Sequence, residues 1–216
     1  MKYKIDLFIK NPRLIKKALN KTRKKYRRYD PGWYLYRKLL QYNIKNKFNN
    51  KFIELVYVTL STWNMNSRGA KLQKFRLFKK SIIKNKKIFL DLSHNKLSRI
   101  LDKNVQSNLK DLFSGLNLVA NGKPRLVTYS KTMHFFLPKL IVPIDRKYTM
   151  RFFYGNTNVP SSIENQFKRF CEIEKQYTIL SKSINLNKFK DRLWNSTIPK
   201  ILDNMIIGYL IMRGIK

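Results

Sequence analysis

The chain has 216 residues, 43% of them hydrophobic and 13% aromatic, which is enough to bury one ordinary core and excludes a globally disordered protein. It contains only seven glycines and seven prolines, which argues against an all-β fold with many tight turns. Lys and Arg number 47 against 12 Asp and Glu, and the net charge of +35 favours a polyanionic partner, with nucleic acid preferred to an anionic membrane surface.

Other classes of protein are excluded by what the sequence lacks. No apolar run reaches the roughly 18 residues of a membrane span, and the first residues lack the apolar segment of a signal peptide. Cys171 is the single cysteine, and neither it nor His94 and His134 has the neighbours of a metal site. We therefore expect an intracellular protein, in the cytoplasm or nucleoid, with no metal, no cofactor and no membrane contact.

The densest positive charge lies near the start of the chain. Abundant Lys, Asn and Ile are typical of an AT-rich genome, but that bias does not explain the scarcity of Asp and Glu. Ten Lys and Arg occur between Lys10 and Arg28, beside an apolar stripe at helical spacing. We interpret residues 1–30 as a basic N-terminal arm or helix ahead of a single domain over residues 31–216. Its expected phosphate contacts are Arg23, Lys24, Lys25, Arg27 and Arg28.

The next segments read as helices in chain order. Asp30-Pro31-Gly32 interrupts the chain, and the apolar run from Phe52 to Trp63 has the length of a buried helix. Apolar residues at helical spacing predict further helices from Leu72 to Ile83 and from Val105 to Asn121, with Asn121-Gly122 ending the latter.

Two helices are predicted near the C-terminus. Ser161 to Glu164 has the pattern of a capping box that opens one helix, and a last helix runs from about Pro199 to Gly214. The fold class is therefore all-α: a compact multi-helix domain with eight to ten helices.

The region from 121 to 155 is the most informative for function. Ser130 or Thr128 is placed to cap a helix that Pro138 ends, and Asp145, in V-P-I-D, is placed to cap the next helix. The order is thus helix, short turn with cations, helix, V-P-x-D, helix. This order resembles the helix-hairpin-helix DNA glycosylase superfamily. The residues that match its catalytic Lys and Asp are Lys131, in Y-S-K-T-M, and Asp145.

The resemblance covers about the central quarter of the chain and departs from the family pattern in two ways. The hairpin glycines that let backbone amides approach a phosphate are absent, and the spacing from Lys131 to Asp145 is shorter than in the family. Side-chain charge would then replace the amide contacts. The cations expected to bind nucleic acid here are Lys123, Arg125, Arg146, Lys147 and Arg151.

The resemblance implies base excision, and so a role in DNA repair. A carboxylate at Asp145 would stabilise positive charge on the sugar as the glycosidic bond breaks, and Lys131 would attack C1′ to form a Schiff base. Two alternatives stay open: a non-catalytic DNA-binding module on the same scaffold, and an RNA-associated protein such as a ribosomal one. Asp145 also suits a purely structural helix cap. The oligomeric state is left open.

Overall fold

The computed structural model describes residues 2–26, 30–65, 71–120, 124–191 and 193–215, with the side chains of residues 2 and 3 left out. Within these ranges the regular secondary structure is helical, and the extended pairing is an isolated antiparallel bridge between Leu72 and Val119. The all-α prediction is confirmed. The α-helices are α1 (Lys2–Lys10), α2 (Pro12–Lys25), α3 (Pro31–Leu40), α4 (Asn50–Thr62), α5 (Phe75–Lys84), α6 (Lys86–Leu92), α7 (Lys103–Gly115), α8 (Leu126–Phe136), α9 (Arg151–Tyr154), α10 (Ile163–Ser183) and α11 (Ile198–Met212).

Shorter turns of helix join these elements. They are the 3-10 helices η1 (Ile44–Phe48), η2 (Leu97–Arg99) and η5 (Leu186–Phe189), and one turn of π-helix, η4 (Arg146–Met150). η4 runs directly into α9, and the left-handed Gly155 ends that pair.

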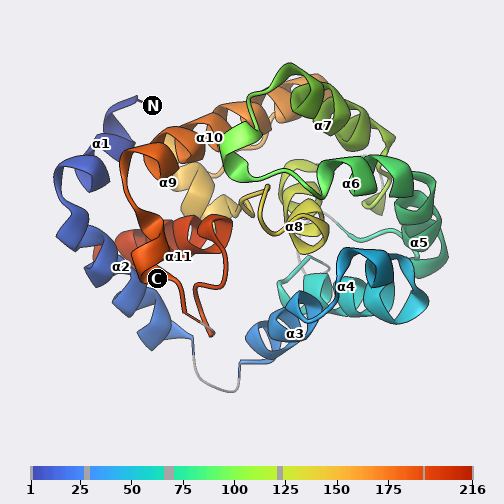
Figure 1. Ribbon diagram of the computed structural model, residues 1–216, viewed down its shortest axis with the longest axis horizontal. Coiled ribbons are helices and arrows are strands. Elements are labelled where there is room, and N and C mark those ends of the chain that lie inside the picture. Colours follow the sequence, from blue (N-terminus) through green and yellow to red (C-terminus); the bar gives the residue numbers. More distant parts are fainter. Residues whose placement is uncertain (1, 27–29, 66–70, 121–123, 192, 216) are drawn as a thin grey trace.

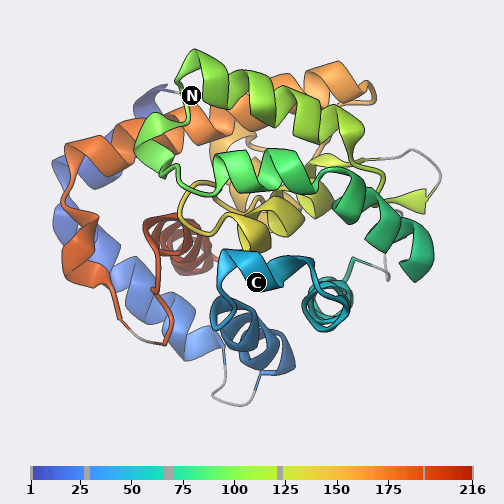
Figure 2. The same ribbon diagram turned by 45° about the vertical axis from the view of Figure 1, so that its right-hand side comes forward.

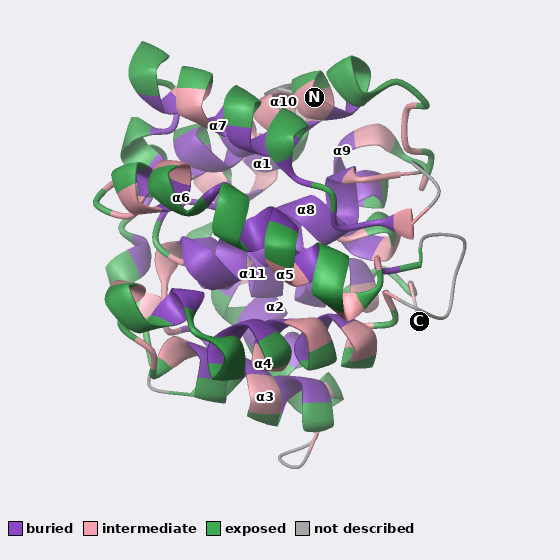
Figure 3. Ribbon diagram, turned by 90° about the vertical axis from the view of Figure 1, so that its right-hand side faces the viewer, coloured by how far each residue is buried: buried purple, intermediate pink, exposed green. Residues whose placement is uncertain are grey.

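Helices α8 and α11 lie in the middle of the molecule and the others surround them (Figures 1 and 2). Every residue of α8 is buried, as expected for a helix that is covered on all sides. Most of α11 is buried as well, and Figure 3 shows exposed residues concentrated on the peripheral helices. A polar side chain on α8 or α11 therefore needs a buried partner or a cavity.

The N-terminal segment, predicted as a basic arm or helix, forms the helices α1 and α2. Helix α2 packs along α11, and Ile15 and Ala18 are fully buried in that contact. Helix α1 contributes Ile5 and Phe8 to the same core. The basic residues occupy the outer face of α2, so residues 12–25 belong to the helical domain. Because the apolar stripe is buried, the high charge density of this segment does not make it an independent arm.

Two predicted helix boundaries are wrong for physical reasons. The helix predicted to reach Asn121 ends at Gly115, because the next residues pair in extended form with residues 71–73: Gln73 N donates to Leu118 O and Ala120 N to Lys71 O. Residues Asn121 and Gly122 lie outside the described ranges. The helix predicted from Leu72 to Ile83 is α5, which begins only at Phe75, because Leu72 takes part in the same extended pairing.

The two C-terminal helices lie where they are predicted, but the first is capped one residue later than the Ser161 of the predicted capping box. Ser162 caps α10 by accepting a hydrogen bond from Asn165 N at 3.1 Å. Thr197 caps α11, where Pro199 lies in the first turn. The described helices include none with the length and apolar content needed to cross a membrane.

Candidate active site

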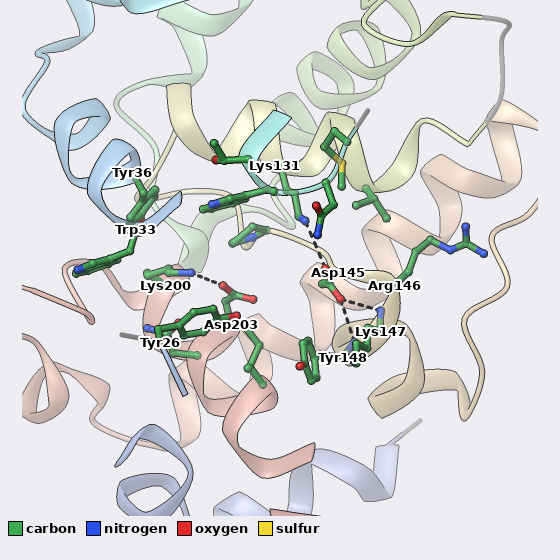
Figure 4. Close-up of a pocket in the computed structure, with 18 of the residues that line it drawn as sticks. Tyr26, Trp33, Tyr36, Lys131, Asp145, Arg146, Lys147, Tyr148, Lys200 and Asp203 are labelled. Carbon is green, nitrogen blue, oxygen red and sulfur yellow. Dashed lines mark hydrogen bonds and ion pairs between the residues drawn. The ribbon is translucent and has the colours of Figure 1, made fainter. Parts of the chain in front are cut away.

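The central pocket of the molecule has a volume of about 380 Å³ and lies between α2, α3, α8, η4 and α11. That volume is within the usual range for small-molecule sites. It brings together both predicted catalytic residues and two predicted cations (Figure 4). The lining includes Tyr26, Trp33, Tyr36, Trp63, Met65, Val127, Lys131, Asp145, Arg146, Lys147, Tyr148, Trp194, Lys200 and Asp203.

Lys131 lies in the middle of α8, so the prediction that Ser130 or Thr128 caps this helix just before it is wrong. The helix begins at Leu126, because the Gln166 side chain on α10 accepts hydrogen bonds from the Arg125 and Leu126 amides at 2.7 and 3.0 Å. These two bonds satisfy amides at the start of α8 that have no partner within the helix. The Ser130 hydroxyl instead accepts from Ile144 N at 3.0 Å and so ties α8 to the V-P-I-D segment.

Asp145 is both a helix cap and a partner of Lys131. Its Oδ1 accepts from the Lys147 and Tyr148 amides at 2.7 and 3.1 Å, which confirms the predicted cap, although the element capped is the π-helical turn η4. Its Oδ2 lies 3.4 Å from Lys131 Nζ. Burial raises the pKa of the Asp145 carboxyl, but Lys131 and the two amides outweigh burial and lower the pKa below its usual value. Asp145 is therefore an ionised carboxylate, and its side chain stays 30% exposed to the pocket.

A second Lys–Asp pair lines the same pocket and was not predicted. Lys200 Nζ lies 2.6 Å from Asp203 Oδ2 within the first turns of α11, and both side chains are almost fully buried. Burial raises the pKa of the Asp203 carboxyl, Lys200 opposes that rise, and the charge of Asp145 adds to it. The spacing of three residues in an otherwise apolar helix was a usable signal, because a Lys and an Asp are costly to bury there unless they pair.

Aromatic rings form much of the pocket wall. Trp33 from α3 and Trp194 from the chain before α11 stack with ring centroids 4.2 Å apart and planes 5° apart. Trp63 lies between the two ion pairs, with Lys131 Nζ 5.3 Å and Lys200 Nζ 5.5 Å from its ring centroid. Flat π-faces beside donors and acceptors are suited to a planar heterocycle.

The predicted nucleic-acid-binding cations are divided between the pocket and other surfaces. Arg146 and Lys147 line the pocket, and Lys25 reaches it indirectly, because its Nζ donates to Tyr148 Oη and lies 5.1 Å from that ring centroid. Arg125 begins α8 and lies over the ring of Tyr129. The remaining described cations, Arg23, Lys24 and Arg151, are exposed and do not line the pocket, and Lys123, Arg27 and Arg28 lie outside the described residues.

Two buried polar residues support the site from behind. His134 Nδ1 donates to Ile141 O at 2.7 Å. Burial lowers the pKa of His134 to about 3, so the ring is neutral and its Nε2 accepts from Tyr36 Oη at 2.8 Å. The bond from Nδ1 to Ile141 O holds the imidazole ring beside the segment that precedes Asp145. Glu174 on α10 accepts from Val142 N at 2.9 Å, and burial raises its pKa well above the usual range.

Metal ligands do not gather in the described residues: they contain no group of three or more His, Cys, Asp and Glu side chains positioned to hold an ion. Comparison of the chain with protein-family models, with curated proteins and with solved structures gives no match. The case for a function therefore rests on the chemistry of this pocket and on the charge around it.

Proposed function

We propose that the chain binds duplex DNA, takes one extruded nucleotide into the central pocket and breaks its glycosidic bond. The observation that carries this proposal is the Lys131–Asp145 pair, which joins a nucleophile to an ionised carboxylate in a pocket walled by tryptophans. The helix-hairpin-helix glycosylase resemblance implies catalysis by the same two residues, but it places the lysine at the start of its helix, whereas Lys131 lies in the middle of α8.

The pocket suits a flipped base rather than a paired one. A base inside a duplex is stacked on its neighbours, so an enzyme that acts on its glycosidic bond must first extrude it. The Trp33–Trp194 stack and Trp63 offer aromatic surface that offsets part of the lost stacking. Arg146 and Lys147 line the same pocket, where positive charge attracts the adjacent phosphates.

Asp145 stabilises the charge that develops at the sugar. As the bond from C1′ to the base nitrogen breaks, its electron pair leaves with the base and C1′ becomes electron-poor. An ionised carboxylate nearby lowers the energy of that state, and the bonds from the Lys147 and Tyr148 amides hold the Asp145 side chain in one orientation. The cap and the catalytic role thus use different oxygens of one side chain.

Lys131 serves first as an acid and then as a nucleophile. Its ammonium gives one proton to the departing base, which leaves neutral, and the amine that remains attacks C1′ with its lone pair. Opening of the sugar ring then gives a protonated Schiff base between Nζ and C1′. Loss of a C2′ proton to water and departure of the 3′ phosphate from that intermediate then cut the strand, so lyase activity follows from the same Schiff base.

Borohydride trapping tests the proposal directly. Hydride reduces a Schiff base to a stable amine, so the protein should become covalently attached to a duplex that carries an abasic site. Lys131→Gln keeps a polar side chain of similar reach and should abolish the adduct while duplex affinity stays within a small factor. Duplex binding by the wild type without an adduct would refute catalysis and leave a non-catalytic nucleic-acid-binding protein; co-sedimentation with ribosomal particles would then identify the RNA-associated alternative.

A further inference from the structure

The Lys200–Asp203 pair has no task in the chemistry proposed above. It is built from two residues one turn apart in α11, the most apolar surroundings in the chain, and both side chains are about nine-tenths buried. A buried ion pair contributes little to stability compared with well-packed apolar residues. Its presence in the wall of a pocket, rather than inside the packed core, points to a ligand.

We propose that Lys200 and Asp203 read the edge of the extruded base and select bases that carry a carbonyl oxygen next to a ring N–H. This inference rests on the proposed function, because it names the substrate class of the same pocket. Bases with such an edge include uracil, thymine, guanine and hypoxanthine.

The hydrogen-bonding capacity of the pair defines that edge. Lys200 Nζ uses one N–H toward Asp203 Oδ2 at 2.6 Å and has two more donors, whereas the carboxylate accepts. Within the described part of the chain, the hydrogen bond to the Asp203 side chain is the one from Lys200 to Oδ2, which leaves Oδ1 to accept from a ligand. The protein thus presents a donor beside an acceptor. A complementary ligand therefore has an acceptor beside a donor. A carbonyl oxygen is a strong acceptor for the Lys200 ammonium group, and a ring N–H is a donor for the Asp203 carboxylate.

The surroundings of the pair favour a flat and uncharged ligand. Lys200 Nζ lies 5.3 Å from the ring centroid of Tyr36 and 5.5 Å from that of Trp63, so aromatic faces flank the polar edge. The Asp203 carboxylate would repel a phosphate placed there. Figure 4 shows Lys200–Asp203 on one side of the pocket and Lys131–Asp145 on another, so a base held by the first pair has its sugar directed toward the second.

The three tryptophans of the sequence all line this pocket, which provides a direct readout. Intrinsic tryptophan fluorescence of the full-length protein therefore reports entry of a base. We would compare two duplexes that differ only in one target base, hypoxanthine or adenine, which differ at the carbonyl and N–H edge. A 2′-fluoro substituent on the target sugar withdraws electron density from C1′ and prevents base release during the titration.

The expected result is quenching at about tenfold lower concentration with hypoxanthine than with adenine, because a site built to pair with one edge rejects the other. Lys200→Gln/Asp203→Asn should abolish that preference. The double variant is used because each single change leaves an unpaired buried charge that destabilises the fold. Asp102→Asn is the matched control, since Arg99–Asp102 is also an i,i+3 pair but is exposed and outside the pocket.

The outcomes separate this inference from the proposed function. Fluorescence anisotropy would measure duplex binding separately. If the duplex binds but the two bases quench equally, or if the double variant keeps the preference, Lys200 and Asp203 do not select the base. Base excision would remain unaffected by that result. Absence of a borohydride adduct would overturn base excision. Absence of any quenching in the wild type would overturn the inference as well, since no base then reaches the tryptophans.

Discussion

The two Lys–Asp pairs of the pocket differ in every property that decides what a charged pair can do. Lys131 and Asp145 come from two segments, lie 3.4 Å apart, and Asp145 is 30% exposed. Lys200 and Asp203 come from one helix, lie 2.6 Å apart, and both are nearly inaccessible. The pKa of Asp145 is lowered by Lys131 and two amides despite burial, whereas burial raises that of Asp203 despite Lys200.

This difference shows that a lysine partner alone does not decide the protonation state of a buried carboxyl group. Both acids have a lysine partner, but Asp145 alone also accepts two backbone amides from η4. Those amides favour the ionised form, which suits the stabilisation of a cation. Two acids whose pKa values move in opposite directions in one pocket are typical of divided roles, here charge stabilisation and recognition.

The largest expected effect is the loss of base release in Asp145→Asn. Asn caps helices almost as well as Asp, so the bonds from the Lys147 and Tyr148 amides should be retained. The buried Lys131 loses its charged partner, so thermal unfolding is measured alongside activity to show that the variant remains folded. Removing the charge opposite the developing cation should slow base release by about a hundredfold to a thousandfold. Single-turnover kinetics on a substrate that the wild type cleaves would measure the change.

The matched comparison is again Asp102→Asn, an exposed acid that should keep full activity. A folded Asp145→Asn protein with wild-type rates would reduce Asp145 to a structural cap and end the distinction between the two pairs. Equal losses in Asp145→Asn and in an Asp203→Asn protein that remains folded would also contradict the division of roles.

The second prediction concerns the packing that positions Lys200 and Asp203. A Cβ on Gly208 would lie 1.8 Å from Ala18 O, so α11 and α2 approach each other with no room for a side chain. Gly208→Ala should destabilise the protein by about 1–3 kcal/mol, because the backbone of α2 must move. Urea denaturation followed by circular dichroism would measure the loss.

Gly115→Ala provides the control for this effect. Its Cβ would meet the Asn85 side chain at 2.6 Å rather than backbone, so a side chain moves instead of a helix. That movement costs the hydrogen bonds from Asn85 Nδ2 to Ser81 O and Gly115 O, and we expect a smaller loss than in Gly208→Ala. Equal stability of the Gly208→Ala protein and the wild type would show that α2 is not firmly packed. In that case the basic segment would behave as the detachable arm that its charge pattern suggests.

How much of this arrangement the sequence predicts depends on the range of the interactions involved. Apolar periodicity predicts helices such as α7 and α10, because burial of one face is a local property. Asp145 was found as a cap because V-P before an acid is a local signal too. The predicted start of α8 was wrong because Gln166, which is 40 residues from Leu126 in the sequence, caps the helix. Lys200–Asp203 was missed although a Lys and an Asp three residues apart in a mostly apolar helix are a local signal, because the sequence does not show that a pocket adjoins them.

The third prediction concerns Glu174, which holds the Val142 amide three residues before Asp145. Its folded pKa lies well above the unfolded value near 4.5, so the folded state keeps a proton that the unfolded state loses. Stability is therefore full below about pH 4.5 and falls as the pH rises, by up to about 1.4 kcal/mol per pH unit. Glu174→Gln cannot ionise and still accepts from Val142.

We expect Glu174→Gln to match the wild type near pH 4 and to exceed its stability increasingly above that pH, as measured by thermal unfolding at several pH values. His134 acts in the opposite sense, since its pKa of about 3 removes stability as the pH falls below its unfolded value. Its contribution is common to both proteins and cancels in the difference. A pH-independent difference would mean that Glu174 is ionised in the fold.

The smallest expected effect concerns Lys25, which links α2 to the side of the pocket that holds Asp145. Its ammonium contacts Tyr148, whose amide binds Asp145 Oδ1, so a phosphate beside the target nucleotide can be bound at this point. Lys25→Gln removes one charge and should weaken duplex binding a few-fold. The slope of log affinity against log salt should fall by about one. Lys110→Gln, on α7 and outside the pocket lining, is the matched control and should leave the slope unchanged.

If both variants lower the slope equally, the positive charge of the whole protein attracts the duplex and Lys25 does not bind a particular phosphate. If Lys25→Gln alone lowers it, the strand is bound on the side of Asp145, which leaves the opposite side of the pocket, with Lys200 and Asp203, for the base.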